Sequence, residues 1–174
     1  MRYLLDTNVL SELRRPEPSK RVVVWLLQNE AACGISELVI GEFVKGAYSL
    51  PDGKKRQAIL AWISEVEDQF EGRMIALDRD VLKRWGELCG VCEREHGRRL
   101  QVLDNLIAAS ALSHGLVVVT RNIVDFPSEI DTFNPWGLTL RADPMTSPQT
   151  GASGLGSLEL ETASRRASTI LRPR

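Results

Sequence analysis

Two polar residues directly follow apolar segments of the chain. Asp6 comes after the stretch 3–5, and Thr120 comes after the valine-rich stretch 116–119. Short apolar runs of this kind are typical of buried parallel strands. Ligands of parallel α/β sheets bind beyond the carboxyl ends of the strands. We therefore expect both side chains at one edge of a sheet.

Three further acids are candidates for the same edge. Asp104 opens an expected helix, Glu42 lies one to two turns into another, and Asp125 closely follows Thr120. Converging carboxylates repel one another unless a cation neutralises them. Mg²⁺ and Mn²⁺ prefer oxygen ligands, and such an ion can turn a bound water into a nucleophile against a phosphodiester. This chemistry needs no histidine, and the chain has only two.

Taken alone, each polar residue has a simpler interpretation. Asp6 and Asp104 are each placed to cap a helix. Glu42 by itself would be a solvated helix residue. Asn122 and Asp125 are of residue types that are common in turns. The prediction of a shared site therefore depends on the order and placement of these residues together.

The elements that would position the acids alternate between strands and helices. Expected strands cover residues 3–5, 32–35, 73–77 and 116–120, with an edge strand near 131–133. Expected helices cover about 9–13, 54–70, 79–95 and 103–114, and two more begin near 19 and 36. This alternation predicts an α/β fold with a parallel sheet that helices cover on both faces.

Length and composition indicate one ordinary domain followed by a tail. The 174 residues carry a net charge of −1, so the chain has no overall basic charge that would itself indicate nucleic-acid binding. Composition changes after Trp136, and we expect a domain at 1–137 and a low-complexity, flexible tail at 138–174. Three cysteines do not suggest a disulfide framework. With no signal peptide or membrane helix in view, we expect a cytoplasmic protein without membrane association.

Five segments resemble PIN-domain proteins, in particular the VapC and FitB type of toxin ribonuclease. The opening LLDTNVLSEL, the segment ISELVIGEFVKGA with a glutamate, and VLDNLIAASAL with a central aspartate resemble the first three motifs of that family. VVVTRNIVDF resembles the fourth motif, and FNPW resembles the end of FitB-like members. The matches lie in the expected order over about residues 1–136.

The resemblance implies a three-layer α/β/α sandwich with a mostly parallel sheet and a Mg²⁺ or Mn²⁺ site. It implies cleavage of RNA, commonly tRNA or rRNA, by a metal-activated water. It also implies a homodimer and a small cognate antitoxin, VapB- or FitA-like, that covers the active site. By position, Asp6, Glu42 and Asp104 become catalytic residues, with Asp6 and Asp104 as metal ligands. Thr7 and Thr120 would support them through hydroxyl contacts.

The fourth acid of the family pattern has two candidate positions. Some members have Asp where this chain has Asn122, and others rely on the acid three residues later, here Asp125. Because Asn122 carries no charge, we expect Asp125 to be the fourth catalytic residue and Asn122 to have a supporting role.

Two other functions are weighed against a toxin ribonuclease. A phosphatase of the haloacid-dehalogenase type also has an aspartate after its first strand, but it needs a second acid at the position of Asn8. A non-catalytic PIN-like module that binds RNA or a partner is the main alternative. Acidic side chains splayed apart in the fold would favour that module.

Two other groups of residues have less specific interpretations. Cys89, Cys92 and His96 can share a helix face, but a zinc site would lack a fourth ligand. Burial of the cysteines as small apolar residues is the favoured interpretation. Arg121 lies inside the fourth motif and is a candidate for contact with an RNA phosphate. An ion pair with a nearby acid is the alternative for Arg121.

Overall fold

The computed structural model describes residues 1–96, 101–137 and 139–141, and its strands form one six-stranded sheet. The strands are β1 (Tyr3–Leu5), β2 (Cys33–Ser36), β3 (Met74–Ile75), β4 (Val117–Val119), β5 (Thr132–Asn134) and β6 (Thr139–Arg141). Their order in the sheet is β3-β2-β1-β4-β5-β6. All pairs from β3 to β5 are parallel, and β6 pairs antiparallel with β5. The prediction of a mostly parallel sheet is confirmed.

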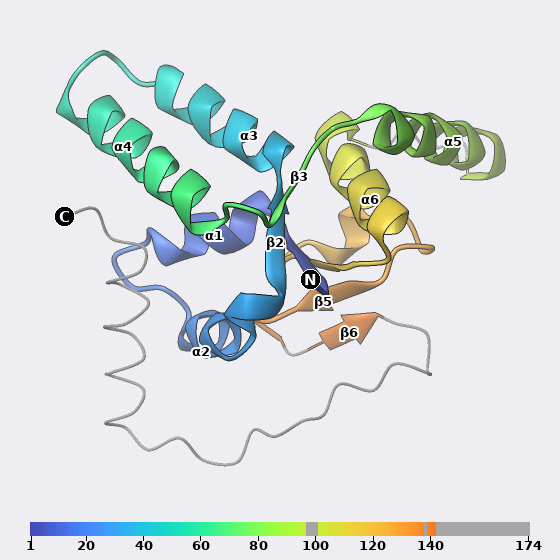
Figure 1. Cartoon of the computed structure of the whole chain (residues 1–174). Helices are drawn as coiled ribbons and strands as arrows, with labels where there is room; N and C mark the ends of the chain where they lie inside the picture. The colour runs from blue at the N-terminus through green and yellow to red at the C-terminus, as the bar shows by residue number, and fades with distance from the viewer. Residues whose placement is uncertain (97–100, 138, 142–174) are drawn as a thin grey trace.

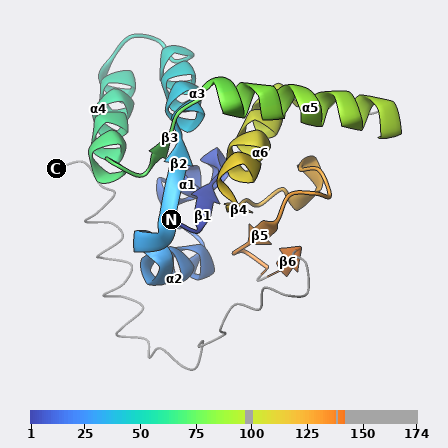
Figure 2. The same ribbon diagram turned by 45° about the vertical axis from the view of Figure 1, so that its right-hand side comes forward.

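Helices cover both faces of this sheet. They are α1 (Thr7–Leu13), α2 (Lys20–Asn29), α3 (Glu37–Tyr48), α4 (Lys54–Gln69), α5 (Arg79–His96) and α6 (Val102–His114), with short 3-10 turns η1 (Glu30–Ala32) and η2 (Ile123–Asp125). Figures 1 and 2 show α2 on one side of the sheet, and the pairs α3–α4 and α5–α6 on the other. The structure is therefore the three-layer α/β/α sandwich that the sequence predicts.

Aromatic contacts join the layers. On one face, the ring of Trp25 in α2 lies 5.1 Å from those of Tyr3 and Phe133, measured between centroids. On the other side, Phe43 of α3 meets Trp62 of α4 edge to face at 4.8 Å. Burial of one large apolar side chain stabilises a fold by about 1.5–3 kcal/mol. The contact between Phe43 and Trp62 fixes α3, the helix that carries Glu42.

Local signals in the sequence define several helix ends. The Ser36 hydroxyl accepts a hydrogen bond of 3.3 Å from the backbone N–H of Leu38 and so caps α3. Gly115 ends α6 with a φ of 62°, in the left-handed region that favours glycine. Helices α3 and α6, which carry Glu42 and Asp104, thus each have one end defined by a specific residue.

The structure differs from the sequence expectations at two places. Helix α1 begins at Thr7 rather than near residue 9, because the carbonyl of Asp6 already accepts a hydrogen bond from the Val9 N–H. Strand β6 was not predicted, and it lies at the start of the segment assigned to the tail. The remainder of that segment, residues 138 and 142–174, lies outside the described residues. Within the described part of the chain, no helix is long and apolar enough to cross a membrane.

Candidate active site

Strand pairing brings Asp6 and Thr120 side by side. Strands β1 and β4 are parallel with Leu5 opposite Val119, and the Asp6 N–H donates to the Val119 carbonyl at 3.0 Å. The Thr120 hydroxyl then donates to Oδ2 of Asp6 at 2.7 Å. Both side chains therefore lie at the carboxyl edge of the sheet, where the sequence predicts them.

Asn8 links Asp6 to the segment after β4. Its side-chain amide donates to Oδ2 of Asp6 and, at 3.0 Å, to the hydroxyl of Thr120. Its Oδ1 accepts a bond of 3.2 Å from the backbone N–H of Arg121. Although Asp6 occupies the N-cap position of α1, its side chain makes no capping hydrogen bond. Capping of α1 therefore does not account for the contacts that the Asp6 side chain makes with Asn8 and Thr120.

Glu42 reaches the same edge from α3. The hydroxyl of Thr7, at the start of α1, donates a hydrogen bond to Oε2 of Glu42. Glu42 is half-buried, so it is not the fully solvated helix residue of the simpler interpretation. Of the two threonines expected to support the site, Thr7 thus contacts Glu42 and Thr120 contacts Asp6.

Asp104 lies in the first turn of α6, and the N-cap position of that helix belongs to Gln101. Asp104 is half-buried. Its burial raises the pKa of its carboxyl group, and the negative charges of Asp125 and Glu42 raise the pKa further. The three acids therefore interact electrostatically, although they come from separate parts of the chain.

The two candidates for a fourth acid lie in different surroundings. Asp125 is half-buried in η2, and its charge acts on Asp104. Asn122 is exposed, and its side chain makes no capping bond to η2. The backbone N–H of Asn122 donates to the Thr120 hydroxyl at 3.0 Å. The charge of Asp125 thus acts on one of the candidate acids, while the hydrogen bond from Asn122 to Thr120 comes from its backbone.

The pKa of the Asp6 carboxyl group is strongly shifted. Its side chain is only 6% exposed, and this burial raises its pKa from 3.8 to about 6. The charges of Asp104 and Glu42 also raise the pKa, while the hydrogen bond from Thr120 lowers it in part. Within the described residues, neither Asp6 nor any of the three other acids has an ion-pair partner. Such uncompensated carboxylates are typical of a site that takes a cation.

The chemistry of the donors fits one kind of metal better than others. No three His, Cys, Asp or Glu residues in the described ranges are arranged to hold a metal ion by themselves. Mg²⁺ commonly uses one or two carboxylates and keeps its remaining waters, so it is compatible with these acids. A zinc site on the cysteines finds no support, because no group of three possible ligands occurs among the described residues, and Cys33 and Cys92 are buried like small apolar residues. The side chain of His96 lies outside the described part.

Two residues of this region were not among the predicted site residues. Asn8, which from the sequence is notable only as a neutral residue where a phosphatase would need an acid, bonds to both Asp6 and Thr120. Glu12 is a charged residue among the apolar positions of α1, and it is buried. The position of Glu12 three residues after Val9, a spacing that places both side chains on one face of the helix, is the signal that could have indicated its burial.

Residues 3–126 match the family model of the PIN domain. This chain belongs to the PIN-domain family. The family resemblance and the fold expected from it are therefore confirmed.

Curated relatives and solved structures agree with that membership. Toxin FitB of Neisseria gonorrhoeae is 34% identical over 137 residues, which cover 76% of this PIN-domain chain and 97% of that protein. VapC ribonuclease Y4jK of Sinorhizobium fredii is 32% identical over 136 residues, 76% of this chain and 96% of that one. The structure of FitAcB from Neisseria gonorrhoeae has a TM-score of 0.68 and 33% identity, covering 78% of this chain and 99% of that chain. A toxin-antitoxin complex from Klebsiella pneumoniae has a TM-score of 0.56 and 25% identity, covering 76% and 97%.

Proposed function

We propose that this PIN-domain protein is the toxin of a type II toxin–antitoxin pair and an endoribonuclease that depends on Mg²⁺ or Mn²⁺. The observation that carries the proposal is the group of four carboxyl groups, Asp6, Glu42, Asp104 and Asp125. They interact at one edge of the sheet, and none has an ion-pair partner in the part of the chain described. The names of two relatives, a toxin and a ribonuclease, support the same function.

Each acid has a role in this proposal. Asp6 and Asp104 would hold the metal ion, and Glu42 and Asp125 would act on it directly or through water. When bound, the ion supplies a water of lowered pKa and stabilises negative charge on the phosphate. Hydrolysis adds one water across a P–O bond of the RNA and leaves one phosphate end and one hydroxyl end.

Uncharged residues beside the acids orient the carboxylate groups of Asp6 and Glu42. Thr120 and Asn8 both donate hydrogen bonds to Oδ2 of Asp6, which leaves Oδ1 without a bond from either of them. Thr7 fixes one oxygen of Glu42. Hydrogen-bonded neighbours of metal ligands usually change metal affinity or activity about 10–100-fold when removed.

The proposal includes partners and a cellular site of action. We expect a homodimer, a small cognate antitoxin that covers the acids, and an RNA substrate, with tRNA or rRNA favoured. A structural relative is itself a toxin-antitoxin complex, which supports the antitoxin partner. We expect the protein to encounter this RNA in the cytoplasm.

We assign the activity to residues 1–137 and none of it to residues 138–174. The match to the PIN-domain model, at residues 3–126, lies wholly within residues 1–137, which supports the assignment of the activity to that part of the chain. A shortened protein ending at Arg141, the last residue of β6, should cleave RNA at the rate of the full chain. A loss of cleavage with retained folding would show that the segment 142–174 contributes.

The toxin proposal is tested by mapping RNA ends in cells after induction. Wild type should generate new RNA ends and arrest growth, and Asp6→Asn should do neither. Asp68→Asn is the matched control, because Asp68 is exposed on α4 and distant in sequence from the four acids. Co-expression of a small open reading frame directly upstream should abolish the new ends. New ends that persist unchanged in Asp6→Asn would overturn the assigned site.

The alternative of a non-catalytic binding module has one observation in its favour. The described acids do not form a ready group of three metal ligands. This alternative predicts RNA binding without new ends in any divalent metal, whereas the ribonuclease predicts ends that require the metal and Asp6.

A further inference from the structure

Glu12 is a buried charge that the proposed reaction does not use. It lies on α1, the helix that follows Asp6, and it is only 5% exposed. A carboxylate is rarely buried to this extent unless it is paired. Here Oε1 accepts from the Ser19 N–H at 2.8 Å, and Oε2 accepts from Nη1 of Arg15 at 3.0 Å. These bonds hold the carboxylate between α1 and the start of α2.

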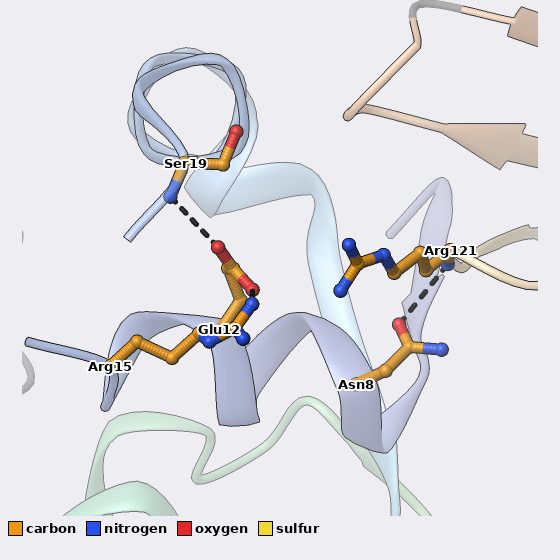
Figure 3. Close-up of polar contacts among 5 residues, drawn as sticks. All are labelled: Asn8, Glu12, Arg15, Ser19 and Arg121. Atoms are coloured by element: carbon orange, nitrogen blue, oxygen red, sulfur yellow. Dashed lines mark hydrogen bonds and ion pairs between the residues drawn. The ribbon is translucent and has the colours of Figure 1, made fainter. Parts of the chain in front are cut away.

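The side chain of Arg121 extends toward this carboxylate. Figure 3 shows the guanidinium of Arg121 pointing from the segment after β4 toward Glu12, with Arg15 on the other side of the carboxylate. The backbone of Arg121 is fixed at both ends, since its N–H donates to Asn8 and its carbonyl accepts from Asn134 at 3.1 Å. Its guanidinium also lies over the ring of Trp136, 5.4 Å from the centroid.

The charges show which acid attracts Arg121. Burial alone would raise the pKa of Glu12, but the bonds from Ser19 and Arg15 and the charges of Arg15 and Arg121 outweigh it and lower the pKa. The charges that act on Asp6 and Asp104 are instead those of other acids. Arg121 directly follows Thr120 in the chain. Its positive charge nevertheless acts on Glu12 rather than on Asp6 or Asp104.

Three arginines gather around Glu12 and Trp136. Arg15 pairs with Glu12, Arg121 lies over the Trp136 ring, and Nη1 of Arg21 donates to the Trp136 carbonyl at 3.1 Å. One carboxylate among three guanidinium groups leaves an excess of positive charge beside the acidic edge of the sheet. Arg121 is exposed, so its remaining donors face solvent. Exposed guanidinium groups of this kind bind phosphates through charge-assisted hydrogen bonds.

We propose that Glu12 is a positioning residue that holds Arg121 at the rim of the site, beside Trp136, where its guanidinium contacts a phosphate of the RNA strand. This inference rests on the proposed ribonuclease function. Without the charge of Glu12, we expect the guanidinium of Arg121 to turn toward the acids of the site, because Arg121 directly follows Thr120, which bonds to Asp6. A guanidinium that paired with those acids would no longer be available to a phosphate.

The test compares Glu12→Gln, Arg121→Ala and the double variant. Binding of a fluorescent single-stranded RNA is measured by anisotropy in a chelator at several salt concentrations, and KM and kcat are measured with Mg²⁺. Arg121→Ala should raise Kd and KM about 10-fold with kcat nearly unchanged, and should reduce the salt dependence of binding by about one counterion. Glu12→Gln should have a similar but smaller effect, and the double variant should equal Arg121→Ala.

Two controls and one rescue accompany these variants. Glu17→Gln removes the same charge from an exposed position nearby, and Lys55→Ala removes a cation from the exposed start of α4. Both should bind RNA like wild type. Arg121→Lys should recover part of the binding, because lysine binds phosphates as a point charge but lacks the planar fork of arginine.

Several results would overturn the inference. Unchanged RNA binding in Arg121→Ala would exclude the phosphate contact, and additive effects in the double variant would show that the two residues act independently. Failure of Glu12→Gln to fold would show that its charge serves folding instead of positioning. A wild type that binds RNA in the chelator but never cleaves it would contradict the ribonuclease alone, because the coupling between Glu12 and Arg121 is measured by binding.

Discussion

Asp6 occupies a site that disfavours its own charge. Burial raises the pKa of Asp6 from 3.8 to about 6, so the metal-free folded protein binds this proton more tightly than the unfolded chain does. The stability that comes from this tighter binding is fully present below about pH 4 and is lost as the pH rises through 6. A difference of about two units corresponds to roughly 3 kcal/mol at most. The acid that the proposed reaction needs therefore weakens the metal-free fold at neutral pH.

Asp6→Asn should accordingly stabilise the metal-free protein. We expect its free energy of unfolding at pH 8 to exceed that of wild type by about 1–3 kcal/mol, since the amide carries no charge to desolvate. The difference should vanish near pH 4. Urea unfolding in a chelator measures both values, with Asp68→Asn as a control that should show no such gain. An Asp6→Asn protein less stable than wild type at pH 8 would refute this explanation.

Thr120→Val should reduce cleavage while the fold is retained. The hydroxyl of Thr120 donates to Asp6 and accepts from Asn8 and from the Asn122 backbone, so its loss removes one hydrogen bond from each of the three. We expect the cleavage rate to fall about 10–100-fold, as is usual for hydrogen-bonded neighbours of metal ligands. Initial rates on RNA with Mg²⁺ provide the measurement.

Thr132→Val is the matched control for that substitution. Thr132 is also fully buried, but its hydroxyl has no hydrogen-bond partner among the described residues. Removal of an unpaired buried hydroxyl is nearly neutral or stabilising, so cleavage should be unchanged. Equal losses in the two valine variants would mean that the hydroxyl of Thr120 has no specific role.

Among the elements, α3 depends on a defined cap to present Glu42. Ser36→Ala removes the side-chain bond to the Leu38 N–H and should destabilise the protein by about 1 kcal/mol. Ser19→Ala is its counterpart, because Ser19 occupies the N-cap position of α2 without a side-chain capping bond. That variant should be within about 0.5 kcal/mol of wild type. Chemical denaturation of both proteins would show whether only the first cap matters.

The elements that position the acids could be predicted because their signals are local. The strands before Asp6 and Thr120 are short apolar runs, and the ends of α3 and α6 carry a serine cap and a glycine stop. Strand β6 could not be predicted in this way. It has the sequence Thr-Leu-Arg and is defined by its antiparallel pairing with β5, which is a tertiary contact.

Residues whose partners lie far away in sequence were also missed. Asn8 bonds to Thr120 and to the backbone of Arg121, which follow β4 more than a hundred residues later in the chain. Whether Asn122 or Asp125 completes the acidic group likewise depends on how η2 turns after β4, and the spacing of the two residues does not give that direction. The sequence could thus predict the members of the acidic group better than the neutral residues that hold them.

Over the whole molecule, a net charge of −1 conceals a separation of charge within the described residues. Four acids without ion-pair partners interact at the carboxyl edge of the sheet, and three arginines gather nearby around Glu12 and Trp136. An acidic group suits a divalent cation, and a basic rim suits the phosphates of a nucleic-acid strand. This arrangement explains how a chain without overall basic charge would bind RNA.

The most direct test of the account is cleavage of purified RNA by wild type and Asp104→Asn in Mg²⁺, each with a chelated control. The account predicts cleavage by wild type that a chelator abolishes, and a rate at least about 100-fold lower in Asp104→Asn, because loss of a metal ligand should exceed the loss of its neighbours. Asp68→Asn should cleave like wild type. Cleavage by Asp104→Asn at the wild-type rate, or wild-type cleavage that persists in the chelator, would contradict a metal-dependent site built on these acids.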